Sequence, residues 1–313
     1  MDRFTAMRSF RRVVEARSFS AAARQLGLSA AAVTKQIAWL ERELATPLLH
    51  RTTRSVTPSE VGAVYYERCA RILDDVEEAD AAARADHAEP RGRIRVNAPV
   101  SFAVVHLGAL AARFRAQFPR VRLELSVTDR HINPTAEGMD VVIRITRHLA
   151  DSELIAQRVA TMHRVMCAAP AYLARRGTPR TLADLGDHDC AVYEGASRPD
   201  LLEFETESGP VAQRVDPCFV AGNSLLLRDA VVAGIGIAIL PSYAVAADLA
   251  AGRLVALLPR FRPLEYGVYA LCARRRDQPV RVRAFIELLA QTLSVPPPAP
   301  ARSTRRRARR PVR

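Results

Sequence analysis

Residues 18–58 read SFSAAARQLGLSAAAVTKQIAWLERELATPLLHRTTRSVTP, and this stretch predicts two short helices joined by a tight turn. Gly27 lies where a helix-ending residue with positive φ is needed. Ser20 and Ser29 are placed to cap the first and the second helix, because a serine hydroxyl can accept a free N–H of the first turn. The second helix then carries an apolar stripe with the spacing of a buried face, formed by Val33, Ile37, Leu40 and Leu44.

The opposite face of the second helix consists of small and polar side chains. Such a face can enter a DNA major groove without steric clash, and it offers methyl groups and hydrogen-bond donors to the base edges. The competing interpretation of Lys35 is an ordinary solvated helix lysine. We predict a DNA-reading face made of Ala30, Ala31, Thr34, Lys35 and Gln36, with Ser20 close to a phosphate group.

Residues 48–56 (LLHRTTRSV) predict a two-stranded hairpin that follows the second helix as a wing. Arg51 and Arg54 project from this wing, where they can contact phosphate or the minor groove. The alternative is a solvated basic loop.

A third helix, longer than the first two, is predicted to begin directly after the wing. Thr57 and Glu60 have the spacing of a capping box, and Pro58 suits the first helical position, where its missing N–H costs nothing. The helix continues to about His87. Because a single long helix has no core of its own, its apolar stripe needs a partner, either a second subunit or the rest of the chain. That stripe has steps of about 3.5 residues and consists of Val61, Tyr65, Arg68 or Cys69, Ile72, Val76, Ala79 and Ala83.

Charge is concentrated at the two ends of the 313-residue chain. Of the formal net charge of +13, residues 302–313 contribute seven arginines and no acid, and residues 1–60 hold ten basic and five acidic residues. A basic end joined to a nearly neutral body fits a nucleic-acid-binding region attached to a part with another task. The tail, residues 294–313, is rich in proline and arginine and is predicted to be disordered, either attracting DNA or merely solvated.

Several other classes of protein find no support in the sequence. The five cysteines have no metal-binding spacing and are predicted to be reduced thiols of a cytoplasmic protein; a redox pair of Cys190 and Cys218 is the minor alternative. The N-terminus lacks the pattern of a signal peptide, and the longest apolar run is too short to span a membrane. Asp187, His188 and Asp189 lie in a polar loop without a nucleophile motif, so we predict neither an enzyme nor a cofactor.

After a hinge at residues 89–92, strands and helices alternate. Residues 93–99, 121–127 and 139–145 predict strands, and residues 101–117 predict a helix between the first two. Strands and helices of these lengths indicate α/β units with a mainly parallel sheet. Further strands and helices of the same kind continue to a final helix at residues 280–293.

Two parts of the sequence resemble domains of one known protein family. The run SFSAAARQLGLSAAAVTKQIAWLERELATPLLHRTTRSVTPSEVG (18–62) resembles the winged helix-turn-helix of LysR-type transcriptional regulators. The segments FRAQFPRVRLEL, GMDVVIRI, AAPAYLARRGTP, DAVVAGIGIAILP, LAAGRLVALLP and QPVRVRAFIELL resemble the co-inducer domain of the same family. That domain has the fold of type 2 periplasmic binding proteins, in which two α/β subdomains enclose a ligand cleft.

The resemblance implies an α+β multidomain chain. A winged helix-turn-helix domain (1–58) and a linker helix with a hinge (59–90) precede an effector-binding domain (91–293). This domain divides into subdomain I (about 91–161 and 265–293) and subdomain II (about 162–264). The linker helix pairs two subunits in a homodimer or homotetramer. Double-stranded promoter DNA and a small-molecule effector are the expected partners, RNA polymerase is a further one, and no membrane is involved.

The helix starts that face the implied cleft suggest an anionic effector, such as a small carboxylate. Backbone N–H groups at a helix start favour anions. By resemblance, the effector-binding residues are Ser101, Phe102, Ala103, Arg144, Thr146, Asn223 and Ser224. The alternative for Ser101 and Asn223 is plain helix capping, and for Arg144 an outward-facing strand position.

Three rival functions are weighed against a LysR-type regulator. A solute-binding protein would explain the α/β body but not the DNA-binding end. An enzyme on the same fold would need a catalytic constellation. A repressor that ignores ligand would share every feature except the response to an effector.

Overall fold

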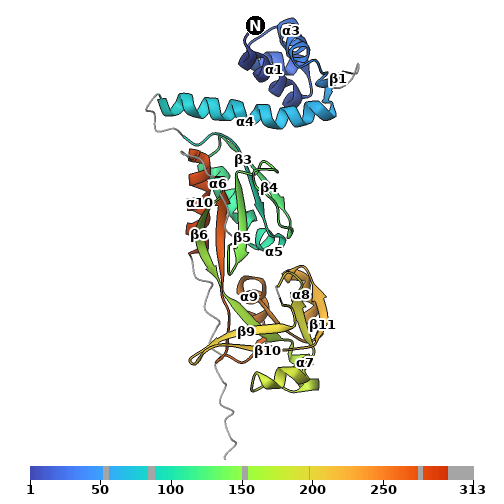
Figure 1. Cartoon of the computed structure of the whole chain (residues 1–313), viewed down its shortest axis with the longest axis vertical. Coiled ribbons are helices and arrows are strands. Elements are labelled where there is room, and N and C mark those ends of the chain that lie inside the picture. The colour runs from blue at the N-terminus through green and yellow to red at the C-terminus, as the bar shows by residue number, and fades with distance from the viewer. Residues whose placement is uncertain (52–55, 84–88, 150–153, 197, 274–277, 295–313) are drawn as a thin grey trace, which may run out of the picture. The chain divides into compact units, whose positions relative to one another are not determined.

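The computed structural model describes residues 1–51, 56–83, 89–149, 154–196, 198–273 and 278–294. The chain divides into two compact units, Met1–Glu89 and Pro90–Arg313 (Figure 1). Arg54, the predicted end of the long helix near His87 and nearly all of the predicted tail lie outside the described residues.

The N-terminal unit is a helical domain with a two-stranded wing. Its apolar core joins the helices to the wing, and Phe10, Ile37, Leu40 and Leu48 are completely buried in it. In the wing the two strands pair antiparallel, with Leu49 opposite Pro58. The elements are α1 (Arg3–Ala16), α2 (Phe19–Leu26), α3 (Ala30–Glu43), β1 (Leu49–Arg51), β2 (Val56–Pro58) and α4 (Glu60–Ala83).

The turn between α2 and α3 has the predicted geometry, with one correction at its start. Gly27 has a φ of 67°, and Leu28 N–H donates to the carbonyl of Ala23 at 2.9 Å. Ser29 caps α3 by accepting the N–H of Ala32 at 3.1 Å. The prediction that Ser20 caps α2 is wrong. Ser18 accepts the N–H of Ala21 instead, so the helix begins earlier and Ser20 lies exposed in its first turn.

The predicted capping box of the long helix is also wrong. Thr57 and Pro58 are taken up by β2, whose pairing with β1 extends through Pro58. Ser59 caps α4 in their place: its hydroxyl accepts the N–H of Gly62 at 2.9 Å and donates to the carbonyl of Pro47 at 2.8 Å. The start of α4 is therefore fastened to the wing.

The first half of α4 packs inside its own unit. Cys69, Ala70 and Leu73 are buried, and Cys69 and Leu73 belong to the core shared with α1. The predicted stripe is thus divided, because Ile72 and Val61 remain exposed on another side of the helix. The intrachain partner accounts for the buried side only.

The C-terminal unit begins with a five-stranded sheet of order β4-β3-β5-β15-β6. β3 runs parallel to β4 and β5, whereas β15 runs antiparallel to β5 and β6 (Figure 1). Helices α6 and α10 pack on this sheet and share its core. The elements are β3 (Gly92–Ala98), α5 (Val100–Phe102), a π-helical turn (Ala103–Leu107), α6 (Gly108–Gln117), β4 (Val121–Val127), β5 (Val141–Thr146), β6 (Ile155–Met162), β15 (Tyr266–Cys272) and α10 (Val280–Leu293).

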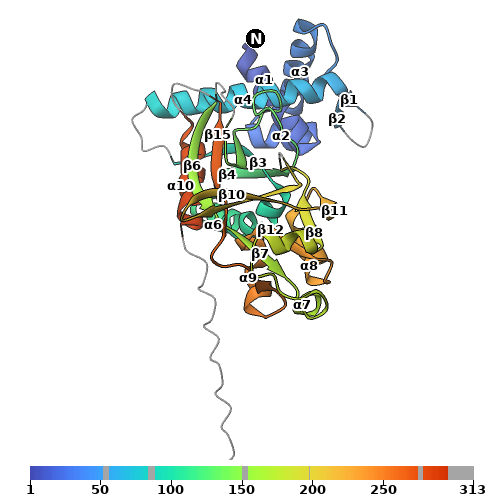
Figure 2. The same cartoon turned by 60° about the horizontal axis from the view of Figure 1, so that its bottom comes forward.

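A second five-stranded sheet has the order β11-β8-β12-β7-β13. Its central strand β12 lies between β8 and β7 (Figure 2) and is buried along its whole length. Separate apolar clusters cover the two faces of the sheet. The elements are β7 (Arg164–Ala168), α7 (Pro170–Arg176), a 3-10 helix (Ala183–Asp187), β8 (Cys190–Tyr193), β11 (Pro217–Ala221), α8 (Ser224–Val232), β12 (Ile237–Pro241), α9 (Ser242–Ala250) and β13 (Val255–Ala256).

Two features of this unit differ from the sequence prediction. The sheets are mixed rather than mainly parallel, since β15 in the first sheet and β7 in the second run against their neighbours. A third sheet, of order β10-β9-β14, was not predicted. It consists of β9 (Leu201–Thr206), β10 (Gly209–Arg214) and β14 (Arg262–Pro263), and Phe204 anchors it in the core of the second sheet.

Candidate DNA-binding face and effector site

The predicted DNA-reading face lies on the outer side of α3. Ala30, Ala31 and Lys35 are exposed, and Thr34 is half-buried. The Thr34 hydroxyl donates to the carbonyl of Ala30 at 2.8 Å. Its donor is therefore engaged within the helix, and the hydroxyl keeps its acceptor capacity and its methyl group for a base edge.

Gln36 has a structural role in addition to the predicted one. Its amide oxygen accepts a hydrogen bond from the hydroxyl of Ser9, which is buried in α1. The side chain therefore ties α3 to α1, and only its NH₂ group is available for a further contact.

Glu41 fixes the wing relative to α3, and sequence analysis missed it. One carboxylate oxygen accepts the N–H groups of Leu48 at 2.9 Å and Leu49 at 3.2 Å. Hydrogen bonds from two backbone donors to one charged acceptor are among the stronger ones in proteins. The strand that carries Arg51 is held to the predicted reading helix through this carboxylate.

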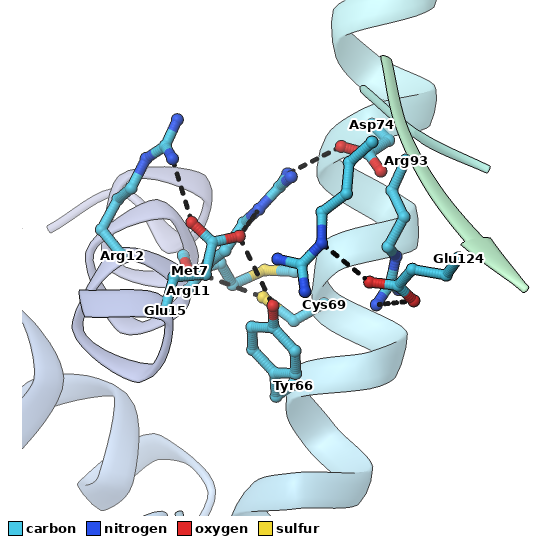
Figure 3. Close-up of polar contacts among 10 residues, drawn as sticks. Met7, Arg11, Arg12, Glu15, Tyr66, Cys69, Asp74, Arg93 and Glu124 are labelled. Atoms are coloured by element: carbon cyan, nitrogen blue, oxygen red, sulfur yellow. Dashed lines mark hydrogen bonds and ion pairs between the residues drawn. The ribbon is translucent and has the colours of Figure 1, made fainter. Parts of the chain in front are cut away.

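A partly buried ion-pair cluster joins α1 to α4 (Figure 3). Arg11 of α1 lies 2.7 Å from the Asp74 carboxylate of α4 and 2.9 Å from Glu15. Burial by itself would lower the pKa of Arg11, but the charges of Asp74 and Glu15 and their hydrogen bonds outweigh it and raise this pKa. The pair thus fixes α4 to the helix-turn-helix core.

The structure brings part of the predicted effector set to the junction between the first and the second sheet of the C-terminal unit. Asn223 caps α8 by accepting the N–H groups of Leu225 and Leu226. Ser224 follows it and is half-buried. Ser101 and Phe102 are buried at the start of α5. Ala103 is wrong as an anion donor, because its N–H already donates to the carbonyl of Pro99 at 2.9 Å.

A carboxylate of the chain itself links these two helix starts. Asp129, in the loop after β4, accepts the N–H of Val100 at 3.1 Å with one oxygen. Its other oxygen accepts the side-chain amide of Asn223 at 3.2 Å. Sequence analysis missed Asp129, because a single aspartate in a polar loop carries no signal of a contact with α8.

Aromatic side chains extend the junction around Asp129. The ring of Tyr243 lies 6.1 Å from that of Phe102 and 5.0 Å from that of His106, measured between centroids. Burial raises the pKa of Tyr193 and of Tyr243, and the negative charge of Asp129 raises it further in both. Both tyrosines are therefore neutral hydrogen-bonding groups at neutral pH.

Arg164, at the start of β7, is a second residue that sequence analysis missed. Its guanidinium lies 4.9 Å from the ring centroid of Tyr266. Burial lowers the pKa of Arg164, yet an arginine remains charged at neutral pH. Among the described residues no carboxylate lies within 4.0 Å of it, so this half-buried cation has no ion-pair partner there.

Arg144 and Thr146 lie in β5 and make local contacts. Arg144 donates to the carbonyl of Ile132 at 3.3 Å and so supports the loop that carries Asp129. The Thr146 hydroxyl donates to the carbonyl of His148 at 2.8 Å. Nothing in these contacts joins either residue directly to Asn223 or Ser224.

The cysteines are free thiols, and all except Cys218 are buried. Burial raises the pKa of Cys190 to about 12. Burial and the nearby Asp189 also raise the pKa of Cys218. Since the thiolate is the reactive form, these surroundings disfavour a redox pair of Cys190 and Cys218.

In the described part of the chain, no helix is long and apolar enough to cross a membrane.

Comparisons with known proteins agree with this division of the chain. Residues 4–63 match the model of the bacterial regulatory helix-turn-helix protein, lysR family, and residues 87–294 match that of the LysR substrate binding domain. The chain is 36% identical over 291 residues to the HTH-type transcriptional regulator PtxR of Pseudomonas aeruginosa, covering 92% of each protein. It is 35% identical over 292 residues to the HTH-type transcriptional activator AaeR of Escherichia coli, covering 92% of this chain and 93% of AaeR.

A solved structure shows the same arrangement of domains along the chain. CrgA, a LysR-type transcriptional regulator from Neisseria meningitidis, matches with a TM-score of 0.60 and 30% sequence identity, covering 93% of this chain and 98% of that one. A helix-turn-helix domain followed by a substrate-binding domain defines a class of transcriptional regulator. The chain belongs to the LysR family of this class.

Proposed function

We propose that the chain binds a partly palindromic promoter site through α3 and the wing, and that a small carboxylate bound between the two α/β subdomains controls this binding. One observation carries the choice of a carboxylate: donors from both subdomains, Val100 N–H and the Asn223 amide, hold a carboxylate at the junction, namely that of Asp129. Arg164, a cation without a carboxylate within 4.0 Å among the described residues, is a further anchor for such an anion.

Oligomerisation through α4 is part of this proposal. Val61, Val64 and Ile72 are exposed, with fractions of 53%, 56% and 46%, and their spacing of three and eight residues places them on one side of the helix. Burying such a face against a second copy would remove apolar surface from water. We infer a cytoplasmic homodimer or homotetramer that acts on RNA polymerase at a promoter and performs no catalytic step.

Replacing Lys35 by alanine is expected to weaken protection of a dyad-symmetric site while leaving the fold intact. Removing one phosphate contact should lower the slope of log binding constant against log salt by about one unit. The measurement is footprinting on the DNA that flanks the gene, followed by a salt titration. Arg42→Ala removes an equal charge from the exposed surface of α3 outside the predicted face, and it is expected to keep the footprint. Equal losses of DNA protection in the two variants would show that α3 contributes only non-specific positive charge to DNA binding.

Replacing Arg164 by glutamine is expected to weaken the binding of a carboxylate effector by about tenfold or more, because a charge-assisted hydrogen bond is removed. Calorimetry of the wild-type chain against a panel of small carboxylates identifies the binder, and the same titration is repeated on the variant. Arg180→Gln, an exposed arginine whose side chain makes no contact among those described, is the matched control. Unchanged binding to Arg164→Gln would remove Arg164 from the site, and no binder in a broad panel would favour a repressor that ignores ligand.

A further inference from the structure

Asp129 makes the hydrogen bonds that the proposed effector needs. Its two oxygens are engaged by donors from opposite sides of the junction, Val100 N–H of the first subdomain and Asn223 Nδ2 of the second. Among the described residues, no cationic group lies within 4.0 Å of Asp129, so neutral donors alone hold its charge. Its side chain is exposed, and the loop that carries it is free of the regular strand pairing of β4.

We propose that Asp129 is a specificity-determining residue: a tethered carboxylate that occupies the position of the effector's carboxylate and that the effector must displace. This inference rests on the proposed function, since it concerns the same site. Two carboxylates cannot accept the same two N–H groups, and their like charges repel each other at short distance. Asp129 must therefore leave the N–H groups of Val100 and Asn223 when an anionic effector binds there.

A tethered competitor raises the apparent dissociation constant of every anionic ligand. A group attached by a short loop acts at an effective concentration on the order of millimolar. An anionic ligand must compete with this effective concentration of Asp129 before it binds. A neutral amide of the same shape meets no charge repulsion, so Asp129 also decides how strongly the site distinguishes an acid from its amide.

Asn223 gives the proposal a second and opposite test. Asp129→Asn removes the competing charge and keeps an oxygen that can accept the N–H of Val100. Asn223→Ser keeps a hydroxyl that can cap α8 and removes the amide donor. The two substitutions break the same hydrogen bond, but the proposal predicts that the first strengthens carboxylate binding and the second weakens it. If this hydrogen bond were purely structural, both substitutions would change the affinity for a carboxylate in the same direction.

The experiment measures the binding of acetate and benzoate, and of acetamide and benzamide as their neutral counterparts, by calorimetry or by the shift in melting temperature of the full chain. For Asp129→Asn, at least one of the two acids is expected to bind about tenfold more tightly than to wild type, while the matching amide changes by less than about twofold. Asp216→Asn, an exposed carboxylate just before β11, controls for the loss of one negative charge.

Three results would overturn the proposal: an equal gain for acid and amide, a weaker acid affinity in Asp129→Asn, or no binding of either acid to any of the proteins. The DNA footprint is read on the same variants. A preserved footprint with unchanged acid binding refutes the role of Asp129 alone, whereas absence of any specific footprint with the wild-type chain refutes the proposed function itself.

Discussion

Replacing Asp74 by alanine is expected to lower the free energy of unfolding of the N-terminal unit by about 3 kcal/mol, because it leaves the half-buried Arg11 guanidinium without its closest counter-charge. The exposed fractions of the two side chains are 3% for Asp74 and 16% for Arg11, so water cannot fully replace the missing carboxylate. Glu15 stays at 2.9 Å from Arg11, which places the expected destabilisation at the lower end for a broken buried pair.

The measurement is urea unfolding followed by the fluorescence of Trp39, the single tryptophan of the chain, which lies in α3 and therefore reports on this unit. Asp80→Ala is the matched control, because Asp80 is exposed on the same helix. Asp74→Asn keeps an acceptor and should lie between the two. A destabilisation below about 1 kcal/mol in Asp74→Ala would place this pair among ordinary surface ion pairs.

Replacing Gly62 by alanine is expected to have a comparable or larger effect on the same unit. A Cβ at this position would lie 1.9 Å from the carbonyl oxygen of Leu48 and 2.8 Å from its carbonyl carbon, so the backbone of one partner has to move. Leu48 cannot move freely, since its carbonyl accepts the N–H of Ser59 and its own N–H donates to Glu41. Overpacking against such a fixed backbone costs about 3 kcal/mol.

A shift of the Trp39 unfolding transition to lower urea concentration, together with a weaker DNA footprint, is the expected readout for Gly62→Ala. Gly108→Ala tests the same substitution where space is free: nothing lies within 4 Å of the added Cβ, and Gly108 has a helical φ of −62°. It should stabilise the C-terminal unit by about 0.5–1 kcal/mol, as alanine does in a helix. A Gly62→Ala protein as stable as wild type would mean that α4 and the wing are not packed as described.

Much of the fold could be predicted because the deciding signals are local. The φ of Gly27, the Ser29 cap and the apolar stripe of α3 all depend on residues a few positions apart, and each is confirmed. The strand at residues 121–127 and the final helix at residues 280–293 also show short local patterns, and both have the predicted bounds.

The errors arise where a distant partner decides the local structure. Ser18 and Ser20 are equally good caps in sequence, and only the strand pairing of β2 with β1 makes Ser59 rather than Thr57 the cap of α4. The strands β9 and β10 mix apolar residues with polar ones, glycine and proline, and their contact with a core depends on Phe204 and Leu202, which pack on the second sheet. At the effector site, Asp129 and Arg164 look ordinary in sequence, because their meaning depends on contacts across the junction between two subdomains.

The carboxylate of Glu41 limits which residues of α3 can be substituted when this regulator is redesigned for another promoter. Ala30, Ala31 and Lys35 on the outer side of α3 can be exchanged, since these exposed side chains make no contact among those described. Gln36 and Glu41 cannot, because one fastens the helix to α1 and the other carries the first strand of the wing. A transplanted recognition helix without Gln36 and Glu41 would carry the new base-contacting side chains but would lose its attachment to α1 and to the wing.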